Sequence, residues 1–143
     1  MPETYWKCFE AGDEAGALAV LEQEALSKQN AVLMFLLGQE YGVAGSPPIQ
    51  DYAKAAQWFK RAAELGDAKA KYEYGLALVL GLGVEKEVQV GVKYIFAAAD
   101  DGNPLALRFL FSTEKQALHN FKLSEKEAIR YLGLARTVDM NDF

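Results

Sequence analysis

The sequence predicts an all-α fold in which antiparallel helix pairs stack on one another into a superhelix. The composition favours helices, since Ala, Leu, Glu and Lys are abundant and proline is absent between residues 49 and 103. A pattern of about 36 residues also repeats along the chain, and a period of that length is typical of stacked helical units. Each unit leaves one face uncovered, so the units are expected to pack against one another.

The chain as a whole is expected to form one repeat domain over residues 1–143. Its 51% hydrophobic content is sufficient to bury a core. The net charge is -5 and no cluster of Lys or Arg is longer than a pair, which disfavours nucleic-acid and anionic-membrane binding. The N-terminus lacks a secretory pattern, no run approaches the roughly 20 apolar residues of a membrane span, and the single cysteine, Cys8, fits a reducing compartment. We therefore expect a cytoplasmic protein.

The first 29 residues are expected to form a capping pair of helices, over about residues 3–11 and 13–28, with Gly12 between them. This segment fits the repeat spacing poorly. The terminal units of a stack need an atypical outer face, because nothing further packs against it. We interpret residues 1–29 as the N-terminal cap.

An amphipathic helix is predicted directly after Asp51, a good N-cap residue, and it ends at Gly66, a good C-cap residue. Its apolar side chains recur at helical spacing and are unusually small: Tyr52, Ala55, Ala56, Phe59, Ala62 and Ala63. A face of this kind favours close packing against a neighbouring helix.

The repeat becomes visible when residues 36–70 are laid over residues 73–106. Gly38 then maps to Gly75 at a spacing of 37. Four further pairs match at a spacing of 36: Trp58 with Tyr94, Ala62 with Ala98, Gly66 with Gly102, and Ala70 with Ala106. A third copy follows, in which Tyr131 stands 37 residues after Tyr94. One unit is therefore a helix, a loop and a second helix.

The second unit shows how these positions act. Gly81 and Gly83 can adopt positive φ at little steric cost, so they are expected to end the first helix. Residues 84–92 are valine-rich like a strand, but their place in the repeat predicts a loop followed by a helix. The packed side of the first helix is predicted to carry Ala70, Tyr74, Gly75 and Leu78, and that of the second helix Tyr94, Ala98 and Ala99.

The residues from Ala70 to Val84 have the order Ala-x-x-x-Tyr-Gly-x-x-Leu-x-x-Gly-x-Gly-Val, and they are followed by Tyr94, paired alanines and Asp-Gly. This pattern resembles the Sel-1-like repeat, a relative of the tetratricopeptide repeat. Residues 30–67 resemble it in their second half but depart from it in the loop at 42–48. Residues 103–143 form a degenerate unit, with Phe111 at the position equivalent to Gly75. The resemblance implies a right-handed superhelix with repeats at 30–67 and 68–102 and a degenerate third repeat, or C-terminal cap, at 103–143.

Candidate chemistry is sparse in this sequence. His119 and Cys8 are its only histidine and cysteine, so neither a zinc site nor a Cys–His nucleophile can be assembled, and we expect no metal and no cofactor. Ser112 and Lys115 match S-x-x-K, the nucleophile motif of penicillin-binding proteins, without an S-D-N or K-T-G companion. Such a short match arises by chance about 0.3 times in a chain of this composition. A serine hydrolase or β-lactam-binding protein is thus the weaker alternative, and we expect no catalytic residue.

A partner surface is expected on the side of each first helix that points away from the packed side. At about 100° per residue, nine positions share it: Val32, Phe35 and Gln39, then Lys69, Tyr72 and Leu76, then Leu105, Arg108 and Ser112. Aromatic, aliphatic and basic groups together suit a protein or peptide ligand. Phe35 and Tyr72 could instead pack between helices, whereas Gln39, Lys69 and Arg108 are expected to be exposed.

These residues favour a non-catalytic protein–protein interaction module. The family resemblance implies an adaptor or scaffold role, or, in bacteria, signalling, stress or virulence-linked roles and immunity to a cognate effector. The competing interpretation is a structural unit that self-associates through the open end of the stack, which leaves both a monomer and a weak homodimer open.

Overall fold

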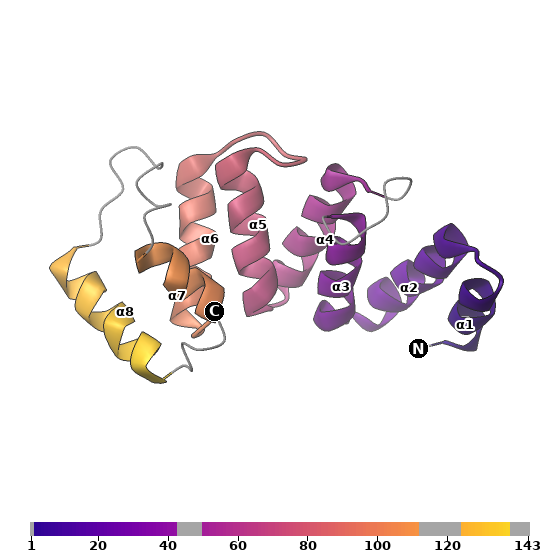
Figure 1. The fold of residues 1–143 in the computed structure, drawn as a ribbon, viewed down its shortest axis with the longest axis horizontal. Helices are drawn as coiled ribbons and strands as arrows, with labels where there is room; N and C mark the ends of the chain where they lie inside the picture. The colour runs from indigo at the N-terminus through magenta and orange to yellow at the C-terminus, as the bar shows by residue number, and fades with distance from the viewer. Residues whose placement is uncertain (1, 43–49, 112–123, 138–143) are drawn as a thin grey trace.

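The computed structural model describes residues 2–42, 50–111 and 124–137, and the regular structure within those ranges is helical. The helices stack in antiparallel pairs into an elongated body with α1 at one end and α8 at the other (Figure 1). The predicted all-α fold is confirmed, and residues 84–92 form a turn and the start of a helix. The bounds are α1 Glu3–Glu10, α2 Glu14–Lys28, α3 Ala31–Tyr41, α4 Tyr52–Glu64, α5 Ala68–Leu80, α6 Val88–Asp100, α7 Pro104–Phe111 and α8 Glu125–Thr137.

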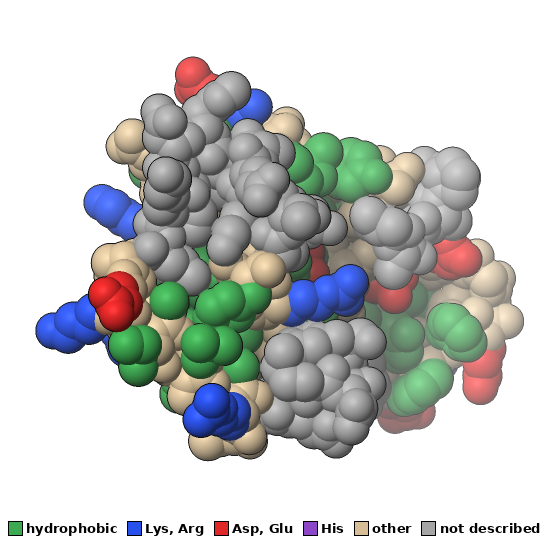
Figure 2. Space-filling model, turned by 60° about the vertical axis from the view of Figure 1, so that its left-hand side comes forward, with side chains coloured by type: hydrophobic (Ala, Val, Ile, Leu, Met, Phe, Trp, Pro, Cys, Tyr) green, Lys and Arg blue, Asp and Glu red, His purple; other side chains and the backbone are tan. Residues whose placement is uncertain are grey.

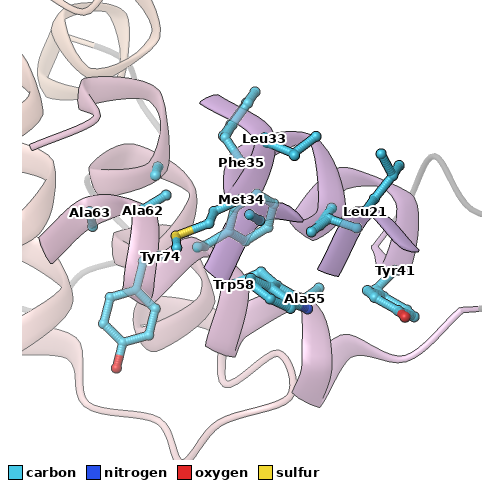
Figure 3. Close-up of a cluster of buried hydrophobic side chains, with 14 of the residues drawn as sticks. Leu21, Leu33, Met34, Phe35, Tyr41, Ala55, Trp58, Ala62, Ala63 and Tyr74 are labelled. Carbon is cyan, nitrogen blue, oxygen red and sulfur yellow. The ribbon is translucent and has the colours of Figure 1, made fainter. Parts of the chain in front are cut away.

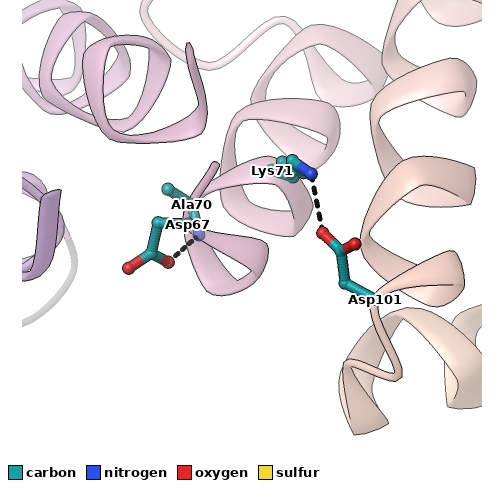
Figure 4. A network of polar contacts seen from close by, with 4 residues as sticks. All are labelled: Asp67, Ala70, Lys71 and Asp101. Carbon is teal, nitrogen blue, oxygen red and sulfur yellow. Dashed lines mark hydrogen bonds and ion pairs between the residues drawn. The ribbon is translucent and has the colours of Figure 1, made fainter. Parts of the chain in front are cut away.

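Several helices begin directly after a short polar side chain that caps them. Asp67 precedes α5, and its Oδ1 accepts a hydrogen bond of 3.0 Å from the backbone N–H of Ala70 (Figure 4). A cap of this kind satisfies a backbone donor that the first turn cannot pair, and it stabilises a helix by about 1 kcal/mol. The same contact is made at α2, α3, α4 and α7 by Asp13, Asn30, Asp51 and Asn103.

The helices α5 and α6 approach each other closely because two glycines face each other across their interface. A Cβ placed on Gly75 would lie 2.8 Å from the carbonyl oxygen of Gly91, and a Cβ on Gly91 would lie 2.6 Å from that of Gly75. Gly75 thus lies on the packed side of α5, as the sequence predicts, and leaves room for the neighbouring helix. Gly38 of α3 similarly leaves room for the ring of Phe59 on α4.

The turn between α5 and α6 depends on glycine at two positions. Gly81 ends α5 in the left-handed conformation with φ of 73°, and Gly83 follows with φ of 72°. Both positions are as the sequence predicts. The backbone of Gly83 also lies directly against the backbone of Tyr52 at the start of α4, with no room for a side chain. The turn of the second unit therefore docks onto the first unit.

Two hydrophobic clusters form the core. The first runs from α2 to α5 and includes Met34 and Trp58, which lie among the side chains that fill the space between these helices (Figure 3). The second joins α5 to α8 and includes Ile95, which is fully buried. The ring of Tyr74 meets that of Tyr94 edge to face at 4.9 Å between centroids. The residues predicted to pack on α5 and α6 are accordingly buried, apart from the half-buried Tyr94.

Polar contacts join the ends of neighbouring helices. Lys71 of α5 pairs with Asp101 after α6 at 2.6 Å (Figure 4). Arg130 of α8 pairs with Asp100 at 2.5 Å, and the buried Tyr131 donates its hydroxyl hydrogen to the same carboxylate at 2.9 Å. Burial, with help from that hydrogen bond, raises the pKa of Tyr131 to about 12. These contacts orient α8 against α6.

The last described helix leaves an apolar strip uncovered. Ile129 is 65% exposed and Leu132 is 47% exposed. A Cβ on the neighbouring Gly133 would meet nothing within 4 Å. Figure 2 shows hydrophobic side chains gathered over α8, with basic groups beside them.

Candidate partner-binding surface

The predicted surface residues are spread along α3, α5 and α7, the first helices of successive units. Gln39, Lys69 and Arg108 are exposed, as the sequence predicts. Val32 and Leu105 are exposed as well, at 63% and 43%. Their role in binding stays a prediction. Ser112 lies outside the described residues.

Phe35 does not lie on the surface, which is the alternative that the sequence leaves open for this residue. It is only 9% exposed, and its ring packs 5.7 Å from the ring of Phe59, measured between centroids. The Nζ of the exposed Lys69 lies over the Phe35 ring, 5.9 Å from its centroid, in a cation–π contact. The phenyl ring reaches the neighbouring helix α4, which a projection of α3 alone does not include. The Phe35 ring therefore contributes to the surface only through its contact with the Lys69 ammonium group.

Tyr72 and Leu76 on α5 are intermediate cases. Both are half-buried and pack against the second hydrophobic cluster. The alternative that Tyr72 packs between helices is therefore correct in part. Leu76 also lines a pocket next to the predicted surface residue Gln39.

This pocket has a volume of about 440 Å³ and opens between α3 and α5, with side chains of α4 and the α5–α6 turn completing its lining. The volume falls within the roughly 300–1,000 Å³ that is usual for ligand pockets. The structure thus brings together two predicted residues, Gln39 and Leu76, from successive first helices. The side chains that define the pocket are Gln39, Tyr52, Phe59, Glu73, Leu76, Leu80 and Leu82.

Of the described residues that line the pocket, Glu73 is the one carboxylate. It is half-buried, and burial raises the pKa of its side chain above the ordinary value. Lys69 lies one turn earlier on α5, but its ammonium group lies over Phe35 instead. Within the described ranges, no hydrogen bond or ion pair engages the Glu73 side chain. The carboxylate therefore faces the pocket without a partner.

Sequence reasoning missed Glu73 and Leu80, although a signal for both was present. At about 100° per residue, they fall on the same side of α5 as Lys69 and Leu76. Leu80 and Glu73 lie beyond Lys69 on one edge of the stripe, about 20° and 40° from it, so a wider stripe on that edge would have included them. Tyr52 gave no such signal, because it belongs to α4, which a projection of the first helices does not include.

The described part of the chain offers little for other chemistry. It contains no group of three or more His, Cys, Asp or Glu side chains that could hold a metal ion. Ser112, Lys115 and His119 lie outside the described residues, and Cys8 is a half-buried free thiol. None of the helices in the described ranges is both long enough and apolar enough to cross a membrane. The pocket between α3 and α5 is the candidate site that contains two of the predicted surface residues.

Comparison with known proteins agrees with this architecture. The chain matches the family model of the Sel1 repeat over residues 31–67 and 68–103. It is similar to the crystal structure of a Sel1 repeat protein from Oxalobacter formigenes, with 24% identity and a TM-score of 0.69, covering 94% of this chain and 54% of that one. It is also similar to a protective antigen of uropathogenic Escherichia coli strains that displays an SLR fold, with 27% identity and a TM-score of 0.70, covering 90% of this chain and 27% of that one. The chain therefore spans about half of the first structure and about a quarter of the second. None of the curated protein sequences compared with it matches.

Proposed function

The chain belongs to the Sel1 repeat family, and on that premise we propose that it is a non-catalytic adaptor that binds a segment of a partner protein along its first helices. Repeats of this family typically mediate protein interactions. The partner segment would lie across α3, α5 and α7, on the side where exposed residues of successive units follow one another.

The observation that carries the proposal is the pocket of about 440 Å³ between α3 and α5. Binding energy at protein interfaces is concentrated in a few side chains that fill pockets of this kind. Leu80 and Leu82, which are 60% and 42% exposed, offer apolar surface at its edge. A partner side chain that enters the pocket would cover both.

The rigidity of the surface supports the same proposal. The residues of the pocket come mainly from helices, and α4 and α5 are capped by Asp51 and Asp67. The Gly75–Gly91 contact fixes α5 against α6. A surface that is ordered before binding loses less entropy when a partner docks.

The test is recovery of a partner from the native cell extract by affinity capture with mass spectrometry. Leu80→Gln and Arg108→Gln each change an exposed side chain, so folding is expected to be unaffected. The double variant that carries both substitutions is expected not to capture the partner protein that the wild type recovers. Leu26→Gln is the matched control, because Leu26 is 40% exposed on α2 and away from the first-helix surface. Equal recovery by the wild type and the Leu80/Arg108 variant would count against this surface.

Self-association is a second candidate function, favoured by the uncovered strip of α8. Ile129 and Leu132 expose apolar surface beside Gly133, where a further helix could approach closely. Light scattering over a range of protein concentrations tests this alternative. A molar mass that rises with concentration for the wild type, but not for Ile129→Lys, would support it. A constant monomer mass would exclude it.

A further inference from the structure

We propose that the pocket between α3 and α5 receives a cationic side chain, preferably arginine, from the bound segment of the partner protein. The arrangement behind the proposal is a carboxylate that has no partner among the described residues, Glu73, in a pocket whose other described lining residues are apolar or uncharged. The inference rests on the proposed function and adds to it the chemistry of the anchoring residue.

The walls of the pocket fit the stem of a long side chain. Leu76, Leu80 and Leu82 line it with aliphatic surface, and Tyr52 and Phe59 add aromatic rings. Lysine and arginine bury their aliphatic stems along such surfaces while the charged end reaches a polar group. Arginine fits best, because its planar guanidinium stacks on aromatic rings and donates two parallel hydrogen bonds to one carboxylate.

The state of Glu73 indicates that the missing partner is a cation. An ionised carboxylate that loses contact with water is costly unless it is paired. The raised pKa of Glu73 has burial as its cause and reflects this cost. On the same helix, the ammonium group of Lys69 lies over the ring of Phe35, and Lys71 is paired with Asp101. A positive charge supplied by a ligand would complete the site.

The charge of the whole chain favours the same kind of partner. Its net charge of -5 attracts basic segments at long range and repels acidic ones. A purely apolar anchor would fill the pocket but would bury Glu73 further without a partner, which adds a desolvation cost. An acidic anchor would place two carboxylates together. Of the apolar, acidic and cationic classes, only the cationic one is complementary to both the walls and the charge.

The experiment selects peptides from a random phage-displayed library with the wild-type chain as bait. Two further baits carry the same chemical change at different places: Glu73→Gln in the pocket and Glu10→Gln on α1, where the side chain is exposed. We expect the wild type and Glu10→Gln to select peptides with a basic residue at a fixed position. Glu73→Gln is expected to lose that preference.

A selected peptide is then synthesised in two forms, with arginine at the fixed position or with citrulline, which keeps the shape and removes the charge. Hydrogen bonds to charged groups contribute about 1.5–3 kcal/mol, so the citrulline form is expected to bind the wild type about 10- to 100-fold more weakly. With Glu73→Gln, the two forms are expected to bind with nearly equal Kd.

The outcomes distinguish failure of the cationic anchor from failure of the adaptor function. Selection of peptides that bind the first-helix surface but carry no basic residue at a fixed position would overturn the cationic anchor without contradicting the adaptor function. The anchor would be overturned in the same way if Glu73→Gln and Glu10→Gln select the same basic peptides. If all selected peptides still bind the Leu80→Gln/Arg108→Gln variant with unchanged Kd, both the anchor and the proposed surface are wrong.

Discussion

Replacing Gly75 with alanine is expected to destabilise the protein, although alanine is the better helix former. Helix propensity alone favours alanine by about 0.8–1.0 kcal/mol. The new Cβ, however, would lie 2.8 Å from the carbonyl oxygen of Gly91 and 2.8 Å from Cγ1 of Ile95. Overpacking of a core typically costs about 1–3 kcal/mol, and a clash with backbone belongs at the upper end because no rotamer change relieves it. We expect a net loss of about 1–2 kcal/mol in the free energy of unfolding.

The assay is urea denaturation followed by far-ultraviolet circular dichroism, with thermal unfolding alongside. A loss of this size lowers the Tm by about 2–8 °C in a chain of this length. Gly75→Val adds two further methyl groups at the same contact and is expected to prevent stable folding.

Gly133→Ala is the matched control for this substitution. Gly133 lies inside α8, and a Cβ there would meet nothing within 4 Å. Only the propensity gain applies, so this variant is expected to be more stable by up to about 1 kcal/mol. The steric role of Gly75 is refuted if Gly75→Ala is as stable as the wild type, or if both alanine variants shift in the same direction.

Three further predictions concern single side chains. Glu73→Gln is expected to raise the free energy of unfolding at pH 7. The folded-state pKa of Glu73 lies above its ordinary 4.5, so the native state holds the proton more tightly than the unfolded state does. The stability of the wild type therefore falls as the pH rises from 4.5 through the folded-state pKa, whereas the stability of the variant does not. A variant that is less stable at pH 7 would contradict this. Asp67→Ala removes the cap of α5 and is expected to cost about 1 kcal/mol in denaturation, whereas the exposed Glu85→Ala in the following turn should cost almost nothing. Tyr131→Phe removes the hydrogen bond to Asp100 and is expected to cost about 1–2 kcal/mol near neutral pH. The pKa of Tyr131 rises from 10.0 to about 12 in the folded state, so its stabilising contribution is lost between those values as the pH rises, and an alkaline titration of stability should be flatter for the variant.

The helices were predictable because their signals are local. The Asp51 side chain caps α4, and the left-handed backbone conformation of Gly81 ends α5. Both effects act within one helical turn. The valine-rich start of α6 is the exception, since composition alone favours a strand there. Its helical state followed from the repeat, in which the position relative to Gly75 outweighs the local preference.

The candidate site was predictable only in part, because a pocket depends on several helices at once. Gln39 and Leu76 fall on the predicted sides of their helices and do line the pocket. Phe35 shares the side of Gln39 but reaches the ring of Phe59 on α4, so it is buried. Tyr52 belongs to α4, which a projection of the first helices does not contain.

Site-specific photocrosslinking in the native cell tests most directly whether the surface between α3 and α5 binds the partner. Benzoylphenylalanine is placed at Leu80, at the edge of the pocket, and separately at Leu26 on α2; both side chains are exposed in the wild type. We predict a covalent adduct with one partner protein from position 80, attached close to a basic residue of that partner, and none from position 26. An adduct from position 26 with none from position 80 would contradict the proposed surface.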